Sequence, residues 1–142
     1  MSGTTELLNY VYNNTQMGVN TIKQLLDIVE DEDFKVHLES QYKEYKEINE
    51  IAEQKLHEMG KEGEGIGSFN EMSAYLMINM KTLMDKSATH IAEMLISGST
   101  KGIVQATRNL KKYSGEEASA VDLMQRLLKT EENNFQQLKK FL

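Results

Sequence analysis

Glu131 is the residue of this chain whose position raises a chemical question. Apolar residues near the C-terminus follow helical steps of three and four with a single step of seven, and they are Val121, Met124, Leu128, Phe135, Leu138 and Leu142. Glu131 falls in the long step, so a helix over this stretch places its carboxyl group on the buried face. Burial without a cationic partner raises the pKa of a carboxyl group, whereas several hydrogen bonds to its charged form lower it.

A belt of polar residues is predicted at the level of Glu131, about halfway along a helical bundle. Counting outward from the predicted helix turns gives its members as Thr15, Gln16, Glu44, Ser97, Ser99, Thr100 and Glu131. Glu44 is expected on the flank of the core and Glu47 farther out. We expect the hydroxyl groups of residues 97–100 to hydrogen-bond with Glu131, and Arg126 and Lys129 to point away from the core.

Four long helices must position this belt. Apolar residues repeat at helical spacing over residues 5–29, 32–59, 88–113 and 116–141. The chain contains no proline, a residue that kinks or breaks a helix when it lies in the helix interior. The pattern predicts an all-α fold with one domain over residues 1–142, in which two antiparallel hairpins form a four-helix bundle. A short extra helix is predicted over 69–84 in the crossover between the hairpins.

The ends of these helices carry recognisable signals. Asp31 and Ser87 precede apolar helical stretches and are predicted N-caps. Ser114 with Glu117 has the pattern of a capping box and predicts the start of the last helix. Gly60 predicts the end of the second helix, because glycine readily takes the left-handed conformation found there.

Composition and charge argue against several classes of function. The net charge is −6 at pH 7, which argues against binding to nucleic acid and to an anionic membrane surface. The chain has no cysteine, which excludes disulfides, thiolate metal sites and cysteine nucleophiles. No apolar run approaches the roughly 18 residues of a membrane span, and the N-terminus lacks the pattern of a signal peptide. We therefore expect a cytoplasmic protein.

Two glycine-containing stretches carry a resemblance to a known superfamily. They are NNTQMGV at residues 13–19 and ISGSTKGIVQATRNL at residues 96–110. Together with the predicted layout, they are similar to the ferritin-like superfamily, in particular to small bacterial ferritin-like domains of unknown function. Those domains have a short crossover helix and a Glu-x-Gly-Glu element in the third long helix, and Gly98 falls at the glycine of that element. The resemblance implies a ferritin-like bundle around a di-iron site.

The same resemblance implies candidate metal ligands. A ferritin-like di-iron site takes a glutamate from each of two helices and a Glu-x-x-His pair from each of the other two. Here the second helix offers Glu44-x-x-Glu47 or Glu47-x-x-Glu50, and the fourth offers Glu131-x-x-Asn134. Glu44, Glu47 and Glu131 are therefore the candidate ligands for iron or manganese.

The chain departs from the family pattern at the remaining ligand positions. The first helix has Gln16, and the third has Ser99 or Thr100, where the family has carboxylates. Amides and hydroxyl groups are poor ligands for iron, and no histidine is expected at this level. We interpret the metal site as degenerate and expect no cofactor, with iron or manganese bound by carboxylates alone as the alternative.

The crossover segment is rich in methionine. Its methionines at helical or near-helical spacing are Met72, Met77, Met80 and Met84. Methionine suits adaptable apolar contacts, and the apolar arc of this segment is wider than a single contact face needs. This predicts a contact between subunits and hence a homo-oligomer, with a dimer favoured, although packing onto the bundle alone is the simpler alternative.

Three functions follow from these observations. The first is a non-enzymatic structural or interaction protein with a degenerate metal site. The second is a ferritin-like metal-binding protein or oxidase with a carboxylate-only site. The third is a small-ligand binder that uses the polar belt as a pocket. Retained iron or manganese would favour the second function, and a void beside residues 97–100 would favour the third.

Overall fold

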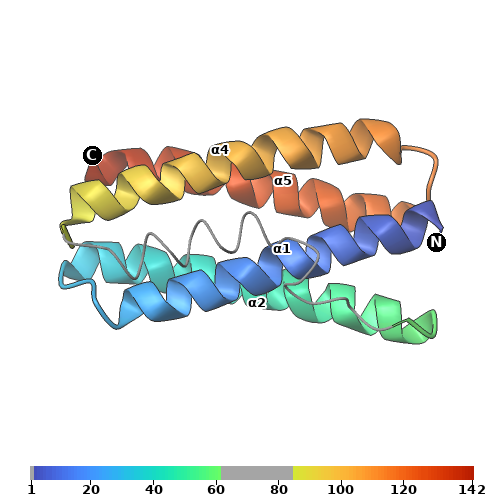
Figure 1. Ribbon diagram of the computed structural model, residues 1–142, viewed down its shortest axis with the longest axis horizontal. Helices are drawn as coiled ribbons and strands as arrows, with labels where there is room; N and C mark the ends of the chain where they lie inside the picture. Colours follow the sequence, from blue (N-terminus) through green and yellow to red (C-terminus); the bar gives the residue numbers. More distant parts are fainter. Residues whose placement is uncertain (1, 62–84) are drawn as a thin grey trace.

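The computed structural model describes residues 2–61 and 85–142, and over those residues it is all-helical, without strands. Its elements are α1 (Gly3–Leu26), α2 (Glu32–Glu58), α4 (Ala88–Lys112), α5 (Ala118–Leu138) and the short 3₁₀ helix η2 (Lys139–Phe141). The four long helices lie side by side along the longest axis of the molecule (Figure 1). The prediction of an all-α bundle of four long helices is therefore confirmed.

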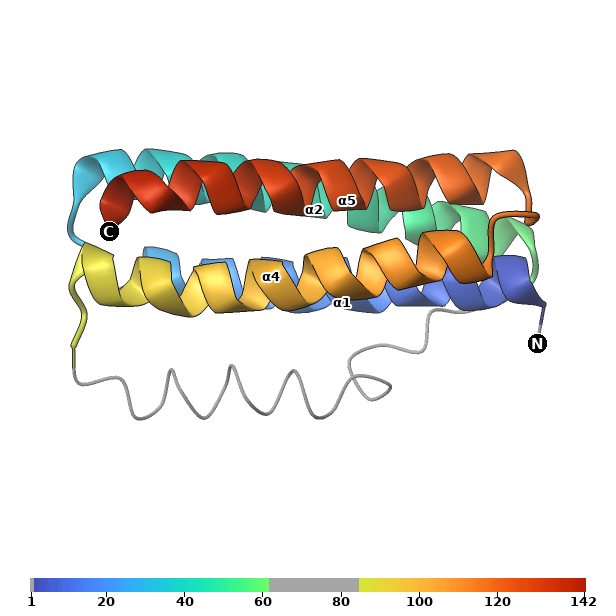
Figure 2. The same cartoon turned by 90° about the horizontal axis from the view of Figure 1, so that it is seen from above.

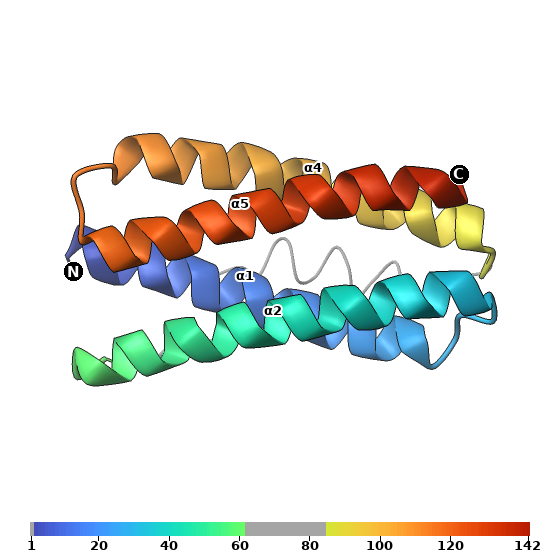
Figure 3. The same ribbon diagram turned by 180° about the vertical axis from the view of Figure 1, so that it is seen from behind.

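Two antiparallel hairpins make up the bundle. The first joins α1 to α2, and the second joins α4 to α5, each through a short connection. Viewed from above, α5 lies over α2, and α4 lies over α1 (Figure 2). In the view from behind, α5 runs lengthwise with α2 beside it (Figure 3), and it packs against both α1 and α2. Residues on α5 can therefore reach α1, α2 and α4.

Local signals set the ends of α2 and the start of α4 as predicted. Asp31 Oδ1 accepts a hydrogen bond of 2.8 Å from the backbone N–H of Phe34, and Ser87 Oγ accepts one of 3.2 Å from that of His90. These bonds satisfy backbone donors that the first helical turn leaves without a partner. Gly60 has φ of 72°, a left-handed conformation that ends α2.

The predicted capping box at the start of the last helix is wrong. The helix begins at Ala118, with Glu117 rather than Ser114 in the N-cap position and without a side-chain capping bond. The carboxylate of Glu117 instead accepts a hydrogen bond from the Ser119 hydroxyl. The spacing of Ser114 and Glu117 fits a capping box, but here both residues belong to the connection that precedes the helix.

One cluster of buried apolar side chains fills the space between the helices. Its largest fully buried members are Leu7, Leu8, Ile22, Leu25, Phe34, Leu38, Ile48, Leu56, Ile91, Met124, Leu127 and Leu138. On α2 the buried residues form one stripe at helical spacing that runs from Phe34 to Leu56, whereas Met59, just after the helix, is 40% exposed. No helix in the described ranges is both long enough and apolar enough to span a membrane.

The buried face of α5 is rotated from the predicted one. Leu127 and Asn134 are buried there, whereas the predicted Leu128 and Phe135 are only partly buried and Leu142 is exposed. Both sets follow steps of three and four, so the spacing alone allows either face. Glu131 is buried in both arrangements.

The predicted crossover helix over 69–84 lies outside the described residues. The same holds for its four methionines, Met72, Met77, Met80 and Met84. The homo-oligomer that they suggested therefore stays a prediction.

Candidate functional site: a buried carboxyl group at mid-bundle

Glu131 is held by side chains from the neighbouring helices and is only 4% exposed. Tyr45 on α2 donates its hydroxyl hydrogen to Glu131 Oε1. Ser99 on α4 makes a second side-chain hydrogen bond to the carboxyl group. Asn134, nearly one turn along α5, donates from Nδ2 to the Tyr45 hydroxyl oxygen over 3.3 Å. Three helices therefore meet at a single carboxyl group.

Two glycines make room for this arrangement. A Cβ atom at Gly102 on α4 would lie 3.0 Å from Glu131 Oε2 and 3.2 Å from its carboxyl carbon. A Cβ atom at Gly18 on α1 would lie 2.9 Å from Cδ2 of the Tyr45 ring. Side chains from α5 and α2 thus occupy the space that a Cβ atom would need at these two glycines.

Burial dominates the electrostatics of Glu131. It raises the pKa of this carboxyl group from 4.5 to about 7, against the hydrogen bonds from Tyr45 and Ser99, which lower it. The group therefore titrates near neutral pH, which an exposed glutamate does not do.

Two tyrosines face the carboxyl group and are held neutral: the buried Tyr45 and the partly buried Tyr10. Burial raises the pKa of both Tyr45 and Tyr10, and the negative charge of Glu131 raises both further. On α1, Tyr10 donates to Gln105 Oε1 over 3.1 Å and accepts from Asn14 Nδ2 over 3.4 Å. Near neutral pH, Glu131 is consequently the group of this cluster that changes charge.

A cavity of about 50 Å³ lies beside Glu131. Its polar wall consists of Asn14, Thr21, Gln41, Tyr45, Ser99 and Glu131. Met17, Ile22 and Leu95 supply apolar surface, and Gly18 and Gly98 leave backbone at its edge. The volume is enough for a few water molecules or a group of similar size. This is the void beside residues 97–100 that favours a small-ligand binder.

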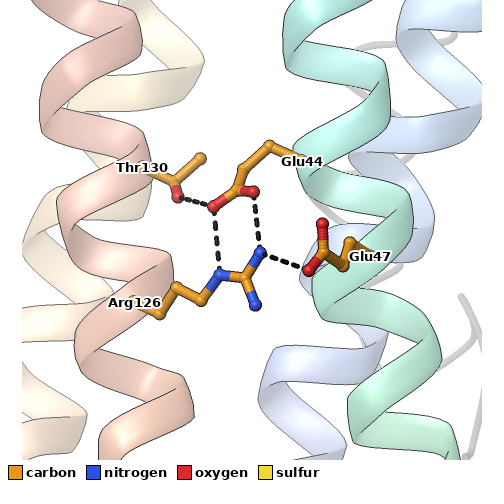
Figure 4. A network of polar contacts seen from close by, with 4 residues as sticks. All are labelled: Glu44, Glu47, Arg126 and Thr130. Carbon is orange, nitrogen blue, oxygen red and sulfur yellow. Dashed lines mark hydrogen bonds and ion pairs between the residues drawn. The ribbon is translucent and has the colours of Figure 1, made fainter.

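Glu44 and Glu47 lie apart from this cavity, in an ion-pair network between α2 and α5 (Figure 4). The Arg126 guanidinium donates to Glu44 through Nε at 3.1 Å and Nη2 at 2.8 Å, and Nη2 lies 3.2 Å from Glu47 Oε1. The Thr130 hydroxyl donates to Glu44 Oε2 over 3.1 Å. The hydrogen bond from Arg126 is the main cause that lowers the pKa of Glu44.

The network lines a groove of about 580 Å³ that adjoins the site around Glu131, since Gln41 lines both the groove and the cavity and Asn134 also lines the groove. Glu131 is not among the groove's lining residues, and neither Glu44 nor Glu47 lines the cavity. Arg126 points away from the core, as expected, because its partners are on the surface of α2. The structure therefore does not bring the three candidate metal ligands together.

On α1, the predicted belt residues have other partners. The Thr15 hydroxyl is buried but donates to the Val11 carbonyl over 2.7 Å and accepts from Asn49 Nδ2 over 3.1 Å. Gln16 is only partly buried, and its Nε2 reaches Asn20 Oδ1 at 3.4 Å. Neither side chain lines the cavity beside Glu131.

On α4, one hydroxyl of the predicted three reaches the carboxyl group. Ser99 is buried and hydrogen-bonds with Glu131. Ser97 is partly buried and does not line the cavity. Placing Thr100 in the core was wrong, because this residue is exposed and donates to the Ile96 carbonyl over 2.9 Å.

Sequence reasoning missed three parts of the site: Tyr45, Tyr10 and Asn134. Tyr45 carried a signal, because it lies at helical spacing among the apolar residues of the second helix and a buried tyrosine hydroxyl normally has a hydrogen-bond partner. Asn134 lies three residues after Glu131, on the same face, and was considered only as a replacement for a metal-binding histidine. Tyr10 carried no comparable signal in its spacing.

The side chains around Glu131 suit hydrogen bonding and proton binding better than binding of a di-iron centre. Within residues 2–61 and 85–142, no three His, Asp or Glu side chains are grouped as metal binding requires. The groups nearest to Glu131 are hydroxyls and an amide, which are weak ligands for iron. Comparison of the chain with protein-family models, curated proteins and solved structures found no match.

Proposed function

We propose that this chain is a non-enzymatic structural or interaction protein of ferritin-like fold whose mid-bundle metal site is degenerate. One observation carries the proposal: the candidate carboxylates belong to two separate groups. Glu131 hydrogen-bonds with Tyr45 inside the bundle, whereas Glu44 and Glu47 bind Arg126 at the groove between α2 and α5. A di-iron centre needs several carboxylates around the same pair of ions.

Arg126 strengthens this argument. Its positive charge neutralises Glu44 and part of the charge of Glu47, and two of its three guanidinium nitrogens, Nε and Nη2, bond with the two carboxylate oxygens of Glu44. A metal ion at Glu44 would have to displace this guanidinium or remain close to it. Displacement breaks the ion pair with Glu44, and a metal ion that stays close is repelled by the guanidinium, so both events cost electrostatic energy.

Titration of the untagged chain with Fe(II) and Mn(II) tests the proposal. The expected result is binding no tighter than roughly millimolar, equivalent to about −4 kcal/mol, and no oxidation of Fe(II) by oxygen above the rate in buffer. The same titration of Arg126→Gln is a useful comparison, because this substitution removes the ion pairs of Glu44 and Glu47 and leaves Glu131 unchanged. Stoichiometric loading with two irons, abolished by Glu131→Ala, would contradict the proposal.

A second candidate function is binding of a small ligand beside Glu131. The cavity of about 50 Å³ favours it, because polar side chains from α1, α2, α4 and α5 converge on a space with an apolar wall. Perturbation of backbone amide signals from residues 95–102 by ligands of two or three heavy atoms would support this function. Perturbations scattered over the surface would count against it.

A further inference from the structure

We propose that the cavity beside Glu131 binds a small primary ammonium ion of about the size of methylammonium. Its nitrogen would lie at the Glu131 carboxylate and its carbon against Met17, Ile22 and Leu95, which line the same cavity. The inference gives the ligand class of the second candidate function and rests on it.

Charge balance selects a monovalent cation. Among the described residues that line the cavity, Glu131 is the only one with a carboxyl group, and none is a lysine or arginine. Within the part of the chain that the structure describes, the other titratable groups facing Glu131 are the neutral phenols of Tyr45 from α2 and Tyr10 from α1, while α4 contributes uncharged Ser99 and Gly102. A buried carboxylate is best balanced by one positive charge, and a divalent metal ion would leave an excess.

The polar wall matches the donors of an ammonium group. A primary ammonium has three N–H donors and no acceptor, so it needs oxygen atoms around it. Tyr45 donates to Glu131 Oε1, and the carboxylate has further lone pairs for the ligand. The side chains of Asn14, Thr21 and Gln41 add oxygens to the wall of the same cavity.

The volume of the cavity and its apolar side chains limit the part of the ligand that lies beyond the ammonium group. An apolar cavity of about 150 Å³ accommodates benzene, which has six heavy atoms. By proportion, the 50 Å³ beside Glu131 accommodates about two heavy atoms, as in methylammonium. The apolar side chains of Met17, Ile22 and Leu95 favour a carbon atom over the hydration shell that a metal ion keeps.

Binding is coupled to the protonation of Glu131. Only the ionised carboxyl group attracts the cation, and burial raises the pKa of this group to about 7. The fraction ionised rises from about one tenth at pH 6 to about nine tenths at pH 8, so the affinity should be about tenfold higher at pH 8. Binding at pH 6 should also release a proton from the protein.

Isothermal titration of the full chain with methylammonium chloride at pH 6 and pH 8, at constant chloride concentration, tests the inference. Saturable binding that is about tenfold tighter at pH 8 is the expected result. Glu131→Gln should abolish it, and the neighbouring Glu132→Gln, which alters an exposed carboxyl group, should leave it unchanged. Leu95→Phe, which fills the cavity and keeps Glu131, provides a second test if the first variant folds poorly by circular dichroism.

Two further ligands distinguish failure of the ammonium inference from failure of the ligand-binding function. Methanol matches methylammonium in heavy atoms but lacks the charge, and tetramethylammonium has the charge but exceeds the cavity. Binding of methanol without methylammonium overturns the inference while the ligand-binding function stands. Binding of neither overturns both. Equal binding of methylammonium and tetramethylammonium, or binding that survives Glu131→Gln or Leu95→Phe, places the cation elsewhere and overturns the inference.

Discussion

Gly102 on α4 lies directly against the carboxyl group of Glu131 on α5, since a Cβ atom at residue 102 would be 3.0 Å from Oε2. Gly98 lies about one turn earlier on the same helix, and a Cβ atom there would meet nothing within 4 Å. Both glycines lower the helix propensity of α4. Only Gly102 also provides space for Glu131, so the two positions separate the backbone effect from the packing effect.

Gly98→Ala is expected to raise the free energy of unfolding by about 0.5–1 kcal/mol, because alanine favours the helix. Gly102→Ala has the same backbone benefit but must displace a buried carboxyl group, and such overpacking costs about 1–3 kcal/mol. Urea unfolding at pH 7 should therefore rank Gly102→Ala below Gly98→Ala. In a Glu131→Ala background the two substitutions should become equivalent. Equal stabilisation in the wild-type background would contradict the contact.

Tyr45→Phe is expected to raise the pKa of Glu131 above its value of about 7, because the Tyr45 hydroxyl donates a hydrogen bond that favours the charged carboxylate. Asn134 also loses its acceptor, so stability at pH 8 should fall by about 1–2 kcal/mol. Carboxyl ¹³C NMR titration measures the pKa. Tyr113→Phe is the matched control, since its hydroxyl binds Glu6 at the surface. An unchanged pKa in Tyr45→Phe would contradict the assigned bond.

Much of the fold could be predicted because its signals are local. The caps at Asp31 and Ser87 and the end at Gly60 each depend on residues within one helical turn. The stripe of α2 has one continuous apolar face, which leaves little choice of orientation. On α5 two overlapping stripes have the same spacing, and the face with Leu127 rather than Leu128 is selected by packing against the other helices.

The candidate site was only partly predictable, because its contacts join distant residues. The spacing on α5 identified Glu131 as buried, but its partner Tyr45 is 86 positions away in the chain. Pairing of Arg126 with Glu44, over 82 positions, likewise depends on how α2 and α5 are rotated against each other. Thr100 was misplaced because a helical threonine can satisfy its hydroxyl with the carbonyl four residues earlier and needs no core partner.

Arg126→Gln should lower stability by about 1 kcal/mol at pH 7, because partly exposed ion pairs contribute little even with good geometry. The pKa of Glu44 is lowered by its bond to Arg126, so this contribution is present above the unfolded pKa and is lost as the pH falls through the folded value. The difference from wild type should thus shrink below about pH 4 and in 1 M salt. Lys129→Gln, at an exposed position three residues along α5, is the control. If the difference in stability between Arg126→Gln and the wild type persists at pH 3, Arg126 stabilises the protein through packing and not through its charge.

Glu131→Gln tests the protonation of the buried carboxyl group through the pH dependence of stability. The folded pKa of about 7 exceeds the ordinary value of 4.5, so the folded state binds the proton more tightly than the unfolded state. Stability is therefore full below about pH 4.5, falls as the pH rises, and levels off above about pH 7. A rise from 4.5 to about 7 corresponds to about 3 kcal/mol, at about 1.4 kcal/mol for each pH unit.

Glutamine keeps the shape of the protonated acid, and its carbonyl oxygen can still accept from the Tyr45 hydroxyl. Glu131→Gln should therefore match the wild type near pH 4.5 and become more stable by up to about 3 kcal/mol near pH 8. Urea unfolding of both proteins across this range measures the difference, and Glu132→Gln should run parallel to the wild type because that carboxyl group is exposed. A loss of more than about 2 kcal/mol in Glu131→Gln at pH 7 would show a charged group in a buried network. Glu131 would then be an ionised, partnered carboxylate, a result that favours a metal or ligand site at this group.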